Sequence, residues 1–184
     1  MPVSRKRADD LSRTLTERVD MNDLRARSPR ALTELARAFS APLYRFVARM
    51  VGQEADAQDV VQQTFASVVD RIDGFEGGPD RLRSWVFTIA YRAAMDVLRG
   101  RRRALPLEGD VPAASADPID LETPATDVRR AFVALSPQDQ YVLTLKYQDD
   151  FSNPEIAEIL GLTPNHVGVL LYRAKQNLRR AVLT

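Results

Sequence analysis

The stretch Leu82 to Arg103, LRSWVFTIAYRAAMDVLRGRRR, most constrains what this chain can fold into. Its spacing predicts an amphipathic helix with a buried apolar stripe of Leu82, Val86, Ile89, Ala93 and Val97. Four further side chains fall largely off that stripe: Trp85, Thr88, Arg92 and Arg99. The arginines at 101–103 repel one another, which favours an anionic partner such as phosphate. A solvated helix end, where arginines complement the negative pole of the helix dipole, is the alternative.

The 184 residues carry a net charge of +1 and include no cysteine and a single histidine, His166. A chain without cysteine forms no disulfide and no thiolate metal site, and one histidine excludes a polyhistidine metal centre. We therefore expect no metal and no other cofactor. No apolar run approaches the roughly 20 residues that a membrane span requires, and the amino-terminal segment lacks the apolar core of a signal peptide. These features predict a cytoplasmic protein without a membrane span.

Ahead of the central stretch, residues 1–20 mix both charges with few apolar anchors, which favours a mobile extension or a short surface helix. We assign residues 1–28 to this extension and expect it to be mobile. From Pro29 the apolar spacing predicts one amphipathic helix, and after Pro42 a second one that Gly52 ends. A further helix opens at residues 56–59, DAQD, and its predicted buried stripe is Val61, Phe65, Val68 and Ile72. Residues 73–80, DGFEGGPD, are predicted to form the loop that leads into the central helix.

Two carboxylates, Asp56 and Asp59, stand near the start of that helix, where negative charge complements the helix dipole. Such a pair could also serve acid–base chemistry or bind a metal, but no nucleophile, general base or phosphate-binding loop accompanies it. Gln62 and Gln63 add hydrogen-bonding groups on the outer side of the helix, which favours a contact surface over a catalytic one. The sequence thus predicts a protein that is not an enzyme.

Beyond Arg103 the composition changes: residues 104–127 contain six acidic residues, four prolines and no basic residue. Such a segment cannot bury a core, so we expect a flexible acidic linker. It divides the chain into two predicted domains, residues 29–103 and residues 128–184. In a free monomer we expect these domains to move independently of each other.

The second domain carries the start and stop signals of several short helices. N-caps followed by an early proline occur at Ser136-Pro137, at Ser152-Asn153-Pro154-Glu155 and at Thr163-Pro164, and Gly161 ends a short helix. Two short helices joined by a tight turn, the second longer and basic, predict a helix-turn-helix that places its second helix in the major groove of DNA. The predicted exposed residues of that helix are Asn165, His166, Val169, Tyr172, Arg173 and Lys175.

Simpler explanations exist for these side chains: His166 as a surface residue without a role, and the basic residues as a solvated tail. The absence of acidic residues from Leu171 to Thr184 argues against the solvated tail, because solvated faces usually mix charges of both signs. Similarly, Trp85 could be mostly a core residue, or it could stack on a base.

Several blocks resemble a known family. Residues 56–65 (DAQDVVQQTF), 83–90 (RSWVFTIA) and 96–99 (DVLR) resemble conserved region 2 of the extracytoplasmic-function (ECF) sigma factors. Residues 135–138 (LSPQ), 155–161 (EIAEILG) and 172–174 (YRA) resemble region 4 of the same family. The blocks follow the family's order and spacing from about Pro29 onward. The resemblance implies an all-α fold with two small helical domains, the second a helix-turn-helix.

The resemblance also implies a function, that of an alternative sigma factor: a dissociable subunit of RNA polymerase that recognises and opens promoter DNA. The residues implied to bind core polymerase are Asp56, Asp59, Gln62 and Gln63. Those implied to recognise and melt the minus-ten element are Arg83, Trp85, Arg92, Arg99, Arg101, Arg102 and Arg103. The six exposed helix-turn-helix residues are implied to read the minus-thirty-five element. Expected partners are core RNA polymerase, promoter DNA and an anti-sigma factor.

Two departures and one rival hypothesis accompany this resemblance. Tyr91-Arg92 stands where the block Ile-Ala-Arg-Asn is common, and Gly168-Val169-Leu170 stands where polar Lys-Ser-Arg is frequent. The rival is a stand-alone helix-turn-helix regulator, which would bind duplex DNA tightly by itself. Nothing in residues 29–103 suggests a ligand pocket for such a regulator, and the arginines there would have no role.

Overall fold

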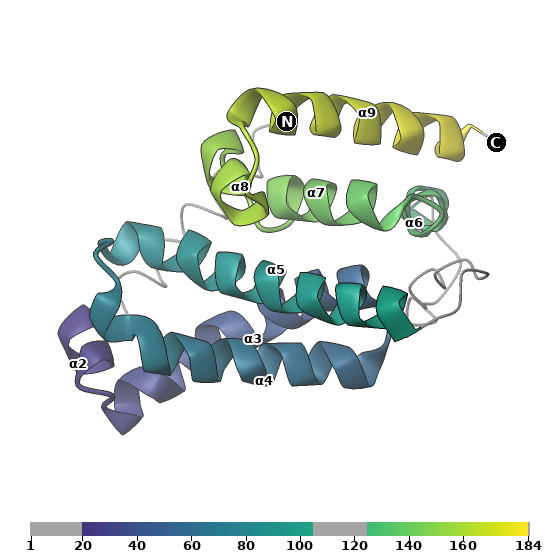
Figure 1. The fold of residues 1–184 in the computed structure, drawn as a ribbon. Coiled ribbons are helices and arrows are strands. Elements are labelled where there is room, and N and C mark those ends of the chain that lie inside the picture. The colour runs from purple at the N-terminus through teal and green to yellow at the C-terminus, as the bar shows by residue number, and fades with distance from the viewer. Residues whose placement is uncertain (1–19, 105–124, 184) are drawn as a thin grey trace.

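A computed structural model describes residues 20–104 and 125–183 of the chain. The described residues contain helices and no strand, which confirms the predicted all-α fold. Figure 1 shows two layers, with α2 to α5 in one and α6 to α9 in the other. Most of the predicted linker, residues 105–124, lies outside the described residues, as do residues 1–19 of the predicted extension.

The first layer begins with α2 (Met21–Arg25), which the Asp20 carboxylate caps by accepting hydrogen bonds from the Asn22 and Asp23 amides. Leu24 is buried beneath this helix with 1% of its surface exposed. The prediction of a mobile extension is therefore wrong for residues 20–28. The N-cap, the buried leucine and the hydrogen bonds of Arg25 and Arg27 to Phe75 and Asp73 hold this segment, although its average composition is polar.

The next helix, α3 (Pro29–Val51), runs without a break through Pro42. The sequence predicted two helices here, because proline removes a backbone donor and crowds the preceding turn. That prediction is wrong, since the apolar spacing continues across the proline: Leu35, Phe39, Leu43 and Phe46 are all buried. Tertiary packing of a continuous stripe outweighs the lost hydrogen bond. Gly52 ends the helix with φ of 72°, as predicted.

The layer is completed by α4 (Glu54–Arg71), the 3-10 turn η1 (Ile72–Gly74) and α5 (Pro79–Ala104). In α4, Val68 is buried as predicted and is followed by buried Ile72 in η1, whereas Val61 and Phe65 are half-buried. In α5 the predicted stripe is buried from Leu82 to Ala93, and Val97 is half-buried.

The second layer consists of α6 (Ala125–Val133), α7 (Pro137–Tyr147), α8 (Asn153–Leu160) and α9 (Pro164–Val182). The predicted end signals are confirmed. Ser136 caps α7, Ser152 and Glu155 form a capping box on α8, and Thr163 caps α9. Gly161 joins α8 to α9 with φ of 66°, so the helix-turn-helix turn depends on a left-handed residue.

The two layers pack against each other, α8 on α5 and α7 on α3. Their buried side chains join in one hydrophobic core. An aromatic cluster fills the contact: Phe46, Phe87 and Tyr91 from the first layer, and Tyr141 and Phe151 from the second. The expectation of independently moving domains took no account of this interface, because it rested on the linker alone.

Candidate nucleic-acid interface

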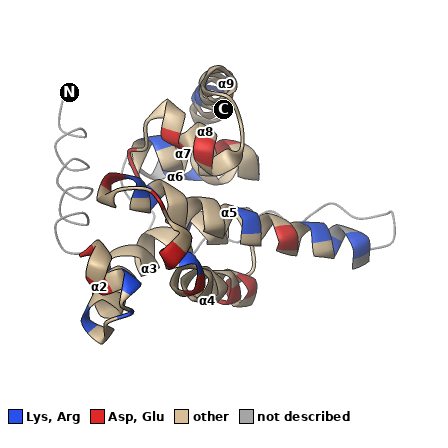
Figure 2. Cartoon of the chain, turned by 60° about the vertical axis from the view of Figure 1, so that its left-hand side comes forward, with Lys and Arg blue, Asp and Glu red and all other residues tan. Residues whose placement is uncertain are grey.

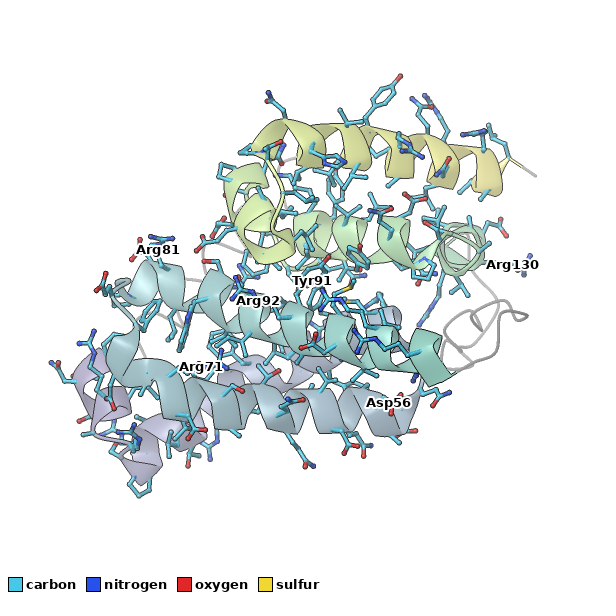
Figure 3. All side chains as sticks on the ribbon, viewed as in Figure 1. Asp56, Arg71, Arg81, Tyr91, Arg92 and Arg130 are labelled. Carbon is cyan, nitrogen blue, oxygen red and sulfur yellow. The ribbon has the colours of Figure 1, made fainter. Side chains whose placement is uncertain are left out.

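The outer face of α4 carries the residues predicted to bind polymerase. Asp59, Gln62 and Gln63 are exposed there as a polar surface. Asp56 differs, because its carboxylate forms an ion pair with Arg101 at the end of α5. Figure 3 shows Asp56 where α4 and the end of α5 come together. The structure thus brings together two residues that the resemblance assigns to different partners.

The carboxy-terminal half of α5 carries several of the arginines predicted to contact DNA, and Figure 2 shows Lys and Arg gathered along it. Arg99 and Arg103 are exposed, and Arg99 also pairs with Asp96 at 2.7 Å. The side chain of Arg102 lies outside the described set. Arg101 is half-buried and also donates to the Val51 carbonyl. Its anionic partner in the structure is Asp56 of the protein itself.

Trp85 lies at the amino-terminal end of α5, half-buried, with its ring centroid 4.6 Å from that of Phe75. The Phe75 carbonyl accepts a hydrogen bond from the Arg25 guanidinium at 3.2 Å. A Cβ at Gly77 would approach the Phe75 ring to 2.4 Å, so any other residue at this position would require the ring to shift. Trp85 is thus partly a core residue, because it packs against the hydrophobic core while remaining half-buried. Its stacking on a base remains a prediction.

Arg83 and Arg92 lie on the same helix but differ in environment. Arg92 is exposed (Figure 3). The Arg83 guanidinium lies 3.9 Å from the Phe151 ring centroid and donates to the backbone carbonyl of Asp149. Burial lowers the pKa of Arg83, although the attraction of Asp149 opposes the change. The second layer therefore covers a residue that is predicted to contact promoter DNA.

Asp149 lies in the contact between the layers, next to Arg45 of the first layer, and is only 4% exposed. Its Oδ1 lies 3.7 Å from the Arg45 guanidinium, and its Oδ2 has no hydrogen-bond partner in the described part of the chain. Burial raises the pKa of Asp149 to about 6, against the opposing attraction of Arg83, Arg45 and Arg49. Desolvation thus outweighs three arginines.

The burial of Asp149 and Phe151 was not predicted from the sequence. They lie in the turn between α7 and α8, where no periodicity marks a buried position. A local signal does exist, because the adjacent Asp150 has φ of 52°, a conformation in which aspartate is one of the few tolerated side chains. Only the packing of the layers shows that the turn points inward.

In the second layer, α9 presents the residues predicted to read duplex DNA. All six are exposed: Asn165, His166, Val169, Tyr172, Arg173 and Lys175. The opposite face of α9 is buried against α7 and α8 through Val167, Leu170, Leu171 and Ala174. The Lys175 amine lies 5.4 Å from the ring centroid of Tyr147, so one cation is partly held by the protein. The predicted exposure is confirmed, and the base contacts remain a prediction.

Within residues 20–104 and 125–183, no group of three or more His, Cys, Asp and Glu side chains could hold a metal ion. Likewise, none of the helices in these ranges is both long enough and apolar enough to cross a membrane.

Known families match both layers. The sigma-70 region 2 family matches residues 35–104, and the sigma-70 region 4 family matches residues 125–178. The sigma factor CarQ of Myxococcus xanthus is 33% identical over 141 residues, covering 73% of this chain and 79% of CarQ. The chain belongs to the extracytoplasmic-function sigma factors. The family predicted from the sequence blocks is therefore confirmed.

A second relative in this family is longer. The ECF sigma factor SigG of Mycobacterium tuberculosis is 31% identical over 207 residues, which cover 92% of this chain. The same alignment covers 55% of SigG, so this chain spans about half the length of that relative.

Solved structures of similar fold include CnrH in complex with the cytosolic domain of CnrY. CnrH matches with a TM-score of 0.62 at 25% identity, covering 93% of this chain and 96% of the other. The likeness therefore extends over both layers. The sigma factor RpoE from Bartonella quintana, solved with the anti-sigma factor NepR, has the same fold, with a TM-score of 0.59 at 24% identity over 77% of this chain and 90% of the other.

Proposed function

We propose that this ECF sigma factor binds core RNA polymerase, recognises and opens promoter DNA, and directs initiation at a specific set of genes in the cytoplasm. The observation that supports this most is the presence of two unlike exposed faces, one in each layer. The face on α4 carries carboxylate and amide groups, whereas α9 carries cations. Such a division suits one protein partner and one polyanionic partner.

Within this function, Asp59, Gln62 and Gln63 bind polymerase, while Asp56 and Arg101 hold α4 against α5. Arg92, Arg99 and Arg103 contact the minus-ten element, together with Trp85, Arg102 and an uncovered Arg83. The exposed residues of α9 read the minus-thirty-five element. Two domains carry these surfaces, residues 29–103 and 128–184, with residues 104–127 as the linker between them. Because RpoE of B. quintana is held by an anti-sigma factor, an anti-sigma factor is also proposed as the regulator here.

The polymerase surface is tested by reversing one charge on α4. Asp59→Arg places a cation in an exposed face without disturbing a buried contact. We expect affinity for core polymerase to fall by about tenfold or more, because complementary charges would become repulsive. Binding is measured by fluorescence titration with core polymerase, and run-off transcription follows initiation.

Asp70→Arg is the matched control, since Asp70 is an exposed aspartate near the other end of α4. It should bind core polymerase like the parent chain, and both variants should keep the helical circular dichroism signal. Equal binding by Asp59→Arg and the parent would place the docking surface elsewhere. A parent chain that binds no polymerase at all would favour the stand-alone regulator instead.

A further inference from the structure

The exposed face of α9 contains an apolar patch among its polar groups. Val169 is 55% exposed and Tyr172 is 65% exposed. They are three residues apart, so they lie on the same side of the helix, away from buried Leu170 and Leu171. In a helix whose apolar side is already packed, these two side chains have no role in the core.

Gly168, next to this patch, is a second unexplained feature. It lies inside α9, and glycine weakens the interior of a helix relative to alanine. A Cβ at this position would meet no atom within 4 Å, and its φ is not among the positive values of the described residues. Neither the backbone conformation nor the internal packing requires glycine here. A close approach by a molecule outside the protein would require it.

The charge around the patch indicates which molecule approaches. Arg173, Lys175 and Arg179 are exposed on the same helix, and the sequence has no acidic residue from position 171 to 184. The first turn presents Asn165 and His166, which carry hydrogen-bonding groups suited to base edges. A cationic helix with a polar first turn fits the major groove of duplex DNA.

We propose, building on the promoter recognition proposed above, that Gly168 lets α9 approach the base edges closely and that Val169 contacts the 5-methyl group of a thymine. That methyl is the one apolar group that a major-groove base edge presents. Valine has no donor or acceptor and therefore distinguishes thymine from the other bases by this group. Tyr172, one turn further along, extends the apolar contact. The minus-thirty-five element of this sigma factor contains a thymine at the position that faces Val169.

The experiment uses the full chain with core polymerase. Bound promoters are first selected from a randomised duplex library, and the thymines of the upstream element are then replaced one at a time by deoxyuridine, which lacks the methyl group. At one of these positions we expect the replacement of thymine by deoxyuridine to weaken binding by the parent about fourfold. This is the effect expected from losing one buried methyl group. Val169→Ala should bind the thymine promoter more weakly by a similar factor and should not distinguish thymine from deoxyuridine.

A second variant tests the close approach. Gly168→Ala should raise Tm, because alanine favours the helix, and should weaken binding to the upstream element of every selected promoter. The matched control is Gly100→Ala on α5, where an added Cβ also meets open space. It should raise Tm as well while leaving binding to a duplex of the upstream element unchanged.

The inference would be overturned if no upstream thymine were sensitive to its methyl group, or if a Gly168→Ala chain bound every promoter like the parent. A Val169→Ala chain that still prefers thymine over deoxyuridine would also overturn it. Failure of the proposed function differs from these results, because the chain would then neither assemble with polymerase nor select any promoter.

Discussion

Asp149 is the least favourably placed charged residue in the contact between the layers. It lies among Arg45, Arg49 and Arg83, yet burial raises its pKa to about 6. Burial also lowers the pKa of Arg49 and Arg83, so these cations are desolvated with it. The contact therefore depends on aromatic packing, and the charges within it are only partly compensated.

This arrangement predicts a pH dependence of stability. The folded chain holds a proton on Asp149 more tightly than the unfolded chain does, for which the ordinary carboxyl pKa is 3.8. The resulting stability is present at low pH and is lost as the pH rises through about 6. Lowering the pH from 7 to 5 should raise the contribution of Asp149 to the free energy of unfolding by about 1 kcal/mol. Urea unfolding at the two pH values measures it.

The matched variants are Asp149→Asn and Asp150→Asn. Asparagine resembles the protonated carboxyl, so Asp149→Asn should lose this increment. Asp150→Asn keeps a residue that tolerates φ of 52° and should retain it. The same pH response in both variants would mean that another group is responsible.

At the scale of the helix, the sequence predicted those features that neighbouring residues determine, such as the ends of helices. Caps at Ser136, Ser152 and Thr163 and the glycine at 161 act within a few residues of themselves, so their effects can be read from neighbouring positions. The exposed face of α9 followed from the same spacing. The predictions that failed concern features that depend on residues far away in the sequence. The continuous helix through Pro42 and the pairing of Asp56 with Arg101 depend on what packs from elsewhere in the chain.

The central helix illustrates this limit. Its predicted stripe is buried except for half-buried Val97, and Phe87, Ala90 and Ala94 are fully buried as well, because α3, α4 and α8 all pack on α5. Because alanine fits either a buried or an exposed helical position, the spacing of apolar residues did not predict that Ala90 and Ala94 are buried. Arg92 is exposed on the remaining side of α5, which leaves it available to contact DNA.

If α5 opens the promoter, Arg92→Ala should reduce transcription far more on a closed duplex than on a template with a pre-opened bubble. The bubble supplies the unpairing energy in advance, so we expect a loss of about tenfold or more on the duplex alone. Arg71→Ala, an exposed arginine of α4 in Figure 3, is the control and should leave both templates unchanged. Equal losses on both templates would assign Arg92 to general DNA attraction or to folding.

At the scale of the whole molecule, the packed layers conflict with the proposed contacts to DNA. Arg83 is covered by Phe151 and the Asp149 carbonyl, and Arg81 pairs with Glu158 at 2.8 Å across the same contact. A chain that uses Arg83 on the minus-ten element must first separate its layers. Aromatic packing resists this separation, while the buried Asp149 charge weakens that resistance at neutral pH.

This conflict predicts that the free chain is closed and that the aromatic cluster keeps it so. Because the chain has no cysteine, Asp70→Cys on α4 and Arg179→Cys on α9 can carry spin labels without competing thiols. The label-to-label distance distribution of the free chain should be narrow. Tyr141→Ala should broaden it toward longer distances, since the Tyr141 ring contacts Phe46 and Tyr91 in the other layer, with centroids 6.4 and 6.3 Å away.

Tyr147→Ala is the control, because Tyr147 lies on the same helix α7 but is 50% exposed. It should keep the narrow distribution, and core polymerase with promoter DNA should convert the parent chain to the longer distances. Closure is measured without polymerase, so it does not depend on the proposed function. A broad distribution for the free parent chain, or equal distributions for the two tyrosine variants, would mean that the aromatic cluster does not hold the layers together in solution.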